Sequence, residues 1–184
     1  MQRIKTLTTA TAQGKAKDLL EGAKKAMGKE LNIFGAMSNA PAALEGLLGL
    51  VGALGKGKLA PALREQLALV TAGANTCDYC ASAHTYLAEK VGVAADERTA
   101  NLKGKSADKK TQSALTFANQ LVEKRGGVSE ADLKAVRDAG FSDEEVIEIL
   151  AHVCLNTFTN YFNEAFKTDI DFPVVNAHGL RSAA

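Results

Sequence analysis

The sequence predicts an all-α protein in which about eight helices form one domain. Apolar residues recur at intervals of three and four from end to end, which is the spacing of amphipathic helices. No run of alternating β-branched residues predicts a strand. Glycines, prolines and serine–acid pairs divide the chain at lengths typical of short helices. The 184 residues are enough for one domain with a substantial core.

The first part of the chain predicts three helices. A helix over Ala12–Met27 is expected to end at the glycine that follows it. Residues 29–40 are expected to form an irregular arm. Pro41 and Pro61 each begin a helix, because proline fits the first helical turn, where its missing N–H is not needed. We therefore expect one structural unit made of an N-terminal helix and arm, residues 1–40, and a helical domain, residues 41–184.

The middle of the chain predicts a helix that carries two cysteines. Asn75 is expected to be its N-cap and Gly92 to end it. A short helix over Ala95–Leu102 and a longer one over Ser106–Arg125 are expected to follow.

Two serine–acid pairs mark the remaining helix starts. Ser129 with Asp132 and Ser142 with Glu145 match the spacing of a capping box. The second pair opens the last helix, which is expected to run to about Phe166. The tail that follows is expected to be extended and to be suited to packing on a partner subunit.

Composition and charge exclude several classes of partner. The formal net charge is +1, so the chain lacks the basic excess that binding to nucleic acid or to an anionic membrane requires. The most lipophilic run, residues 42–54, contains Glu45 and three glycines and is too short to span a bilayer. The N-terminus lacks the apolar run of a secretory signal, so a cytoplasmic location is expected. Three cysteines are too few for a disulfide scaffold.

The strongest chemical signal is Cys77-Asp-Tyr-Cys80 followed by His84. At about 100° per residue, a helix places both thiols and the imidazole on one face. A cysteine near a helix N-terminus ionises readily, and an imidazole four residues after Cys80 can accept the thiol proton. The pair can also close a disulfide. Glu65, on the preceding helix, would be a base or proton relay.

Several readings of this group remain open. The histidine favours Cys80 as the first nucleophile, whereas the helix N-terminus favours Cys77; we favour Cys80. The same side chains could bind zinc, with a fourth ligand from another acid or from Cys154, His152 or His178. A general disulfide reductase, a redox sensor and a packed apolar stripe are further alternatives. Cys154 is flanked by aliphatic residues and is expected to be a buried, inert thiol.

The arrangement Glu65-x11-Cys77-x2-Cys80-x3-His84 resembles the signature of the alkyl hydroperoxidase D-like members of the carboxymuconolactone decarboxylase family. The lead-in over residues 61–70 and the segment over residues 156–163 are also similar. Some peroxidase members have a second histidine directly before the later cysteine, where this chain has a tyrosine. The lactone decarboxylases of the wider family typically lack the cysteine pair, which argues against that reaction.

The resemblance implies an all-helical thiol peroxidase that needs no cofactor and forms a homo-oligomer. It assigns the redox and proton-relay roles to Cys77, Cys80, His84 and Glu65. The implied substrate is a hydroperoxide, and the implied partner is an external dithiol or a thioredoxin-like reductant.

Overall fold

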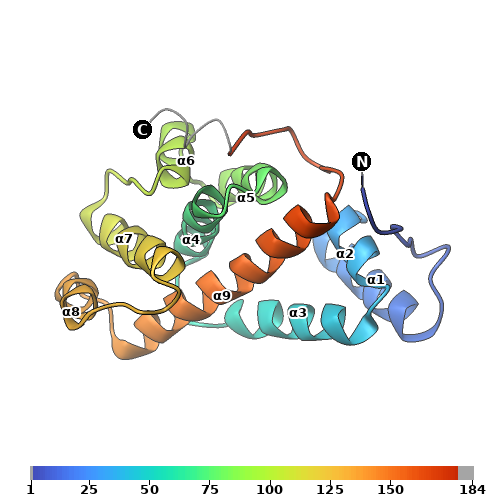
Figure 1. The fold of residues 1–184 in the computed structure, drawn as a ribbon, viewed down its shortest axis with the longest axis horizontal. Coiled ribbons are helices and arrows are strands. Elements are labelled where there is room, and N and C mark those ends of the chain that lie inside the picture. Colours follow the sequence, from blue (N-terminus) through green and yellow to red (C-terminus); the bar gives the residue numbers. More distant parts are fainter. Residues whose placement is uncertain (1, 178–184) are drawn as a thin grey trace.

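The computed structural model describes residues 2–177, and all regular secondary structure in that range is helical (Figure 1). The prediction of an all-α fold is confirmed. The nine helices of this range are α1 (Gly14–Met27), α2 (Asn32–Met37), α3 (Pro41–Leu54), α4 (Pro61–Ala74), α5 (Asp78–Lys90), α6 (Ala95–Leu102), α7 (Lys109–Glu123), α8 (Glu130–Asp138) and α9 (Asp143–Phe166).

Most helix boundaries follow from local sequence signals. Pro41 and Pro61 are the first residues of α3 and α4, as predicted. Helix α1 ends at Gly28, which adopts a left-handed conformation with φ 74°. Both predicted capping boxes are present, with Ser129 and Ser142 as the N-caps of α8 and α9. These elements form where short-range hydrogen bonds and backbone preferences decide the structure.

Two local predictions were wrong. Residues 29–40 were expected to be irregular, but they contain α2, which forms because Ile33 and Met37 are buried against the neighbouring helices. Asn75 was expected to cap α5, but it is the C-cap of α4. Its side-chain amide donates to the Oδ1 atom of Asn160 at 2.9 Å and is therefore engaged elsewhere. Cys77 caps α5 instead.

The longer helix predicted over residues 106–125 is also shorter than expected. It is α7, and it starts at Lys109 because the carboxylate of Asp108 accepts a hydrogen bond from the backbone N–H of Thr111.

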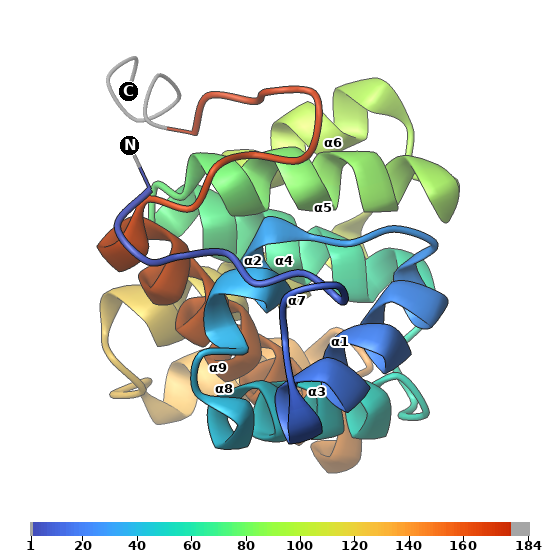
Figure 2. The same ribbon diagram turned by 90° about the vertical axis from the view of Figure 1, so that its right-hand side faces the viewer.

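Helix α4 is the centre of the fold and contacts α5, α6, α7 and α9 (Figures 1 and 2). Every residue from Gln66 to Gly73 is buried. At the crossing with α6, a Cβ atom on Gly73 would lie 1.9 Å from the carbonyl oxygen of Leu102. Glycine is therefore required for this close approach. The long helix α9 crosses below α4 and α5 and above α3 in Figure 1.

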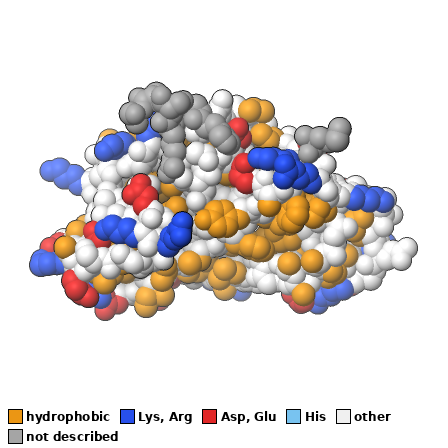
Figure 3. Space-filling view, viewed as in Figure 1, with side chains coloured by type: hydrophobic (Ala, Val, Ile, Leu, Met, Phe, Trp, Pro, Cys, Tyr) orange, Lys and Arg blue, Asp and Glu red, His pale blue; other side chains and the backbone are white. Residues whose placement is uncertain are grey.

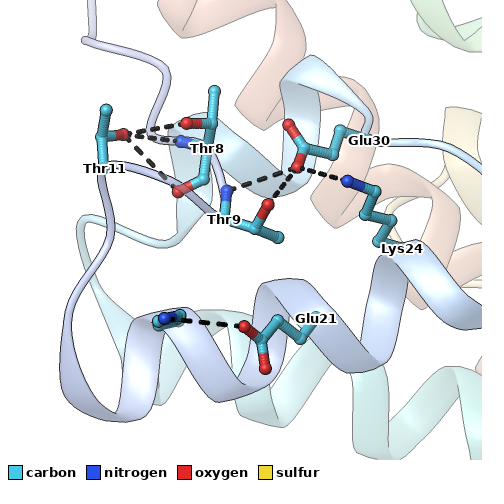
Figure 4. Close-up of polar contacts among 7 residues, drawn as sticks. Thr8, Thr9, Thr11, Glu21, Lys24 and Glu30 are labelled. Atoms are coloured by element: carbon cyan, nitrogen blue, oxygen red, sulfur yellow. Dashed lines mark hydrogen bonds and ion pairs between the residues drawn. The ribbon is translucent and has the colours of Figure 1, made fainter.

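The N-terminal segment is fastened to α1 and α2 by polar contacts (Figure 4). The Thr9 hydroxyl donates to Glu30 at 2.5 Å, and the same carboxylate forms an ion pair with Lys24 at 3.1 Å. Thr8 and Thr11 bond to each other through the Thr8 N–H, at 2.9 Å. Helices α1 and α2 in turn pack on α3 and on one another.

The C-terminal strap, residues 168–177, is extended as predicted and lies along α5 of its own chain (Figure 2). The hydroxyl of Ser82 accepts the backbone N–H of Val175 at 2.8 Å. The phenol of Tyr79 donates to Asp171 at 2.6 Å. Across residues 2–177, no helix combines the length and apolar character needed to cross a membrane.

Candidate functional site

Glu65 and His84 form an ion pair between α4 and α5. The Oε2 atom of Glu65 lies 2.8 Å from Nδ1 of His84, and each side chain is 21% exposed. Burial alone lowers the pKa of His84, but the charge and hydrogen bond of Glu65, together with Cys80, outweigh it and raise the pKa. The imidazole is therefore held toward its protonated form beside the cysteines.

The two cysteines are reduced, fully buried and in contact with each other. Cys77 lies just before α5 rather than within it, and its sulfur accepts the backbone N–H of Cys80 at 3.4 Å. Cys77 is 0% exposed and Cys80 is 2% exposed. The two thiols also interact with each other directly. The N-cap geometry, rather than a shared helical face, brings the sulfur atoms together.

This contact gives the two thiols opposite acidities. Burial raises the pKa of Cys80, but the hydrogen bond from Cys77, the charge of His84 and the amides of Asn163 and Asn160 outweigh it and lower the pKa to about 7. The hydrogen bond to Cys80 and then burial raise the pKa of Cys77. Of the two thiols, Cys80 is therefore the more acidic.

Two buried amides on α9 face Cys80. The Nδ2 atom of Asn163 donates to the Cys80 sulfur at 3.3 Å. Asn160 is 0% exposed and Asn163 is 3% exposed. Within residues 2–177, neither Nδ2 of Asn160 nor Oδ1 of Asn163 has a hydrogen-bond partner. The sequence analysis did not identify Asn163 as a site residue. The helical spacing of Asn156, Asn160 and Asn163 could have indicated that the three amides lie on one face of the helix.

These groups open onto a pocket of about 390 Å³. Cys80, His84 and Glu65 line it, whereas Cys77 lies behind Cys80. Most of the lining is apolar and comes from α1–α3 and the segments between them, from α5 and α9, and from the strap. The apolar lining residues include Met27, Leu31, Ile33, Phe34, Leu47, Val51, Leu87, Val91, Leu155 and Phe172. The N-terminal 54 residues thus form much of the pocket wall.

Tyr79 occupies the position between the cysteines and points its phenol away from them. Its hydroxyl donates to Asp171 of the strap, and its ring meets Phe172 edge to face with centroids 6.1 Å apart. Burial, followed by the Asp171 carboxylate, raises the pKa of this phenol. Tyr79 therefore fastens the strap over α5.

The remaining predicted ligands do not gather around the cysteines. Cys154 was expected to be buried, but it is exposed on α9 because the helix turns it away from its buried neighbours. His152 is buried and lines the pocket. His178 lies outside the described residues. Among residues 2–177, no group of three or more His, Cys, Asp or Glu side chains is arranged to hold a metal ion.

A sequence model of the carboxymuconolactone decarboxylase family matches residues 39–100, a range that includes Glu65, Cys77, Cys80 and His84. The resemblance to this family is confirmed. The matched region contains α3, α4 and α5; α4 carries Glu65, α5 carries Cys80 and His84, and Cys77 is the N-cap of α5. No curated protein matches the chain significantly.

Solved structures share the fold over nearly the whole chain. The alkylhydroperoxidase AhpD core of an uncharacterized peroxidase-related protein from Ralstonia eutropha JMP134 is 23% identical, with a TM-score of 0.81 over 92% of each chain. A peroxidase-related protein from Silicibacter sp. TM1040 is 20% identical, with a TM-score of 0.80 over 91% of each chain. The debrominase Bmp8, in complex with 2,3,4-tribromopyrrole, is 18% identical; its TM-score is 0.78, over 98% of this chain and 96% of Bmp8. The fold is therefore that of alkylhydroperoxidase D-like proteins.

Proposed function

We propose that this protein is a thiol peroxidase that reduces organic hydroperoxides with Cys80 and Cys77. One observation carries the proposal: the cysteine that lines the pocket is also the one whose pKa is lowered, and a second, protonated thiol contacts it from behind. A nucleophile at the substrate and a resolving thiol within reach are the two parts that disulfide-forming peroxide reduction needs.

The first step uses the Glu65–His84 pair. The Cys80 thiolate attacks the distal oxygen of the hydroperoxide, and the O–O bond breaks. Cys80 becomes a sulfenic acid, and the leaving alkoxide takes a proton from the His84 imidazolium to give an alcohol. The carboxylate of Glu65, 2.8 Å away, stabilises the imidazolium before the transfer and orients its ring.

The second step closes the disulfide. The Cys77 thiol attacks the sulfur of the sulfenic acid, its proton goes to the departing hydroxide, and one water is released. Before this step, the oxygen atom of the Cys80 sulfenic acid needs hydrogen-bond partners, because it lies inside a buried site. The two unpaired amide atoms on α9 supply them, because Nδ2 of Asn160 is a donor and Oδ1 of Asn163 is an acceptor.

Two features of the pocket bear on its substrates. The apolar wall of α1–α3 favours an organic hydroperoxide over hydrogen peroxide, because an alkyl or aryl group gains free energy when it leaves water. Burial of both sulfur atoms favours reduction of the disulfide by a small dithiol that enters the pocket. The same burial disfavours a general reductase of protein disulfides.

Thiol-dependent removal of a halogen from a small aromatic ring is a second candidate. The debrominase Bmp8 shares the fold over 98% of this chain. A ring would fit the apolar pocket, and Cys80 and Cys77 could supply two electrons by closing the same disulfide. Bromide release from tribromopyrrole, compared with peroxide consumption, separates the two candidates.

Cysteine variants test the proposal with cumene hydroperoxide as substrate and dithiothreitol as reductant. We expect Cys80→Ser to abolish peroxide consumption and Cys77→Ser to abolish turnover after one Cys80 sulfenic acid has formed. Cys154→Ser is the matched control, because that thiol is exposed and does not line the pocket, and it should keep the full rate. Equal rates in all three variants would contradict the proposal.

A further inference from the structure

The pocket has a second polar region, formed by Arg64 of α4 and His152 of α9. Arg64 is half-buried, and its Nη1 atom donates to the carbonyl oxygen of Leu54 at 3.1 Å. Within the described residues, 2–177, Arg64 forms no ion pair. A partly desolvated guanidinium with no carboxylate partner is costly, unless an anion binds to it.

His152 supplies an independent sign of a missing partner. Its side chain lines the pocket, the residue is 6% exposed, and its Nε2 atom is buried without a hydrogen-bond partner. Burial and then the positive charge of Arg64 lower the pKa of His152, so the ring is neutral. A buried ring nitrogen that bonds to nothing in the protein requires an explanation, and a bound ligand provides one.

The acidic side chains near this region are already engaged. Glu65 is paired with His84 at 2.8 Å. The carboxylate of Glu148 accepts the backbone N–H groups of Lys58 at 2.9 Å and of Leu59 at 3.0 Å. The charge of Arg64 is therefore left for a ligand.

We propose that Arg64 and His152 bind the carboxylate of an organic substrate whose apolar part lies against the wall formed by α1–α3. The guanidinium presents parallel N–H groups to the two carboxylate oxygens, and the neutral imidazole donates one further hydrogen bond. The proposal rests on the proposed function in one respect, because it places the reacting group of the same substrate at Cys80.

The length of α9 sets the size of this substrate. His152 and Asn160 are eight residues apart on the helix, which corresponds to about 12 Å along its axis. Asn160 faces Cys80, so the carboxylate and the reacting group are placed about this far apart along α9. This separation matches a medium-chain carboxylic acid that carries a hydroperoxide near its far end.

Binding of decanoate to the reduced protein, measured by titration calorimetry, tests the inference without any catalytic step. We expect decanoate to bind at least about tenfold more tightly than 1-decanol, which has the same chain and no charge. Arg64→Gln should remove that difference, and Arg64→Lys should restore part of it. The matched control is Arg137→Gln on α8, which makes the same substitution at an exposed ion pair outside the pocket. This variant should bind decanoate as tightly as the wild type.

Equal affinity of the wild-type protein for decanoate and 1-decanol would overturn the inference. This comparison uses only the wild-type protein, so it does not depend on whether a variant folds. Unchanged decanoate affinity in Arg64→Gln would also overturn it. The result is separable from the proposed function. If cumene hydroperoxide is reduced but decanoate is not preferred, only the carboxylate site fails. If decanoate is preferred but no hydroperoxide is consumed, only the peroxidase proposal fails.

Discussion

The reactive side of the pocket and its apolar wall are built in different ways. Glu65 comes from α4, Cys80 and His84 come from α5, and Cys77 is the N-cap of α5. All four lie within 20 residues of sequence and are fixed by hydrogen bonds and one ion pair. The wall of α1–α3 is fixed by apolar packing and by polar contacts at its edge, such as the Thr9–Glu30 hydrogen bond (Figure 4). Substitutions in the two regions should therefore affect different quantities.

The largest effect is expected from the ion pair. Glu65→Gln removes the negative charge that raises the pKa of His84, so less of the imidazole is protonated and the leaving oxygen loses its proton donor. We expect kcat/KM to fall about 100-fold with cumene hydroperoxide and with hydrogen peroxide alike, since both need the same proton.

Steady-state kinetics with both peroxides measure this effect. Glu45→Gln is the matched control, because Glu45 forms an exposed ion pair with Lys15 on the outer surface of α3. A loss confined to the bulky peroxide would show that Glu65 shapes the pocket rather than moving a proton.

A smaller effect is expected from the wall. Phe34→Ala removes a ring that lines the pocket and leaves the groups around Cys80 in place. We expect the ratio of kcat/KM for cumene hydroperoxide to kcat/KM for hydrogen peroxide to fall about tenfold, because only the bulky substrate loses apolar contact. An equal loss for both substrates would mean that the wall and the reactive side are not separable.

The smallest effect is expected in the acidity of Cys80. Asn163→Leu removes the N–H donor 3.3 Å from the sulfur, so the thiolate is less stable and the pKa of Cys80 rises above about 7. A rise of about one unit corresponds to the loss of one hydrogen bond to a charged group. Activity at neutral pH should then fall, and the rise of activity with pH should move to higher pH.

Ultraviolet absorbance of the thiolate, followed against pH, measures this shift directly. Asn119→Leu on α7 is the control, because that amide donates to Glu123 at 2.8 Å in an exposed hydrogen bond. An unchanged titration curve in the Asn163 variant would show that this α9 amide does not lower the pKa of Cys80.

An apolar patch lies on the surface of α3 and α9, on the face shown in Figure 3. The large exposed apolar residues on these two helices are Leu50, Val51, Ile147, Leu150, Phe158 and Tyr161. The resemblance implies a homo-oligomer, and this patch is a candidate surface for its interface.

The features that the sequence predicted correctly are those that depend on residues close together in the chain. Helix starts at Pro41, Ser129 and Ser142 follow from one or two residues each, and the structure has them. The grouping of Glu65 with His84 was anticipated from the resemblance, and the structure places the two side chains in contact. Their catalytic roles stay predictions.

What the sequence did not predict depends on contacts between distant segments. Helix α2 forms because the fold buries Ile33 and Met37. Its N-terminus has no side-chain cap that could have predicted it from the sequence. Cys154 has aliphatic neighbours in sequence, yet neighbours on a helix are turned by about 100°, so their burial does not carry over to it. The contact of Asn163 with Cys80 spans 83 residues and required the packing of α9 on α5.

Counting free thiols before and after one equivalent of cumene hydroperoxide tests whether Cys77 and Cys80 form the reactive pair. The protein has three cysteines, all reduced in this structure. We expect that two thiols disappear together, that Cys154 remains free, and that the protein gains no oxygen. If three thiols remain, or if only Cys154 is oxidised, the buried pair is not the reactive centre and the account is contradicted.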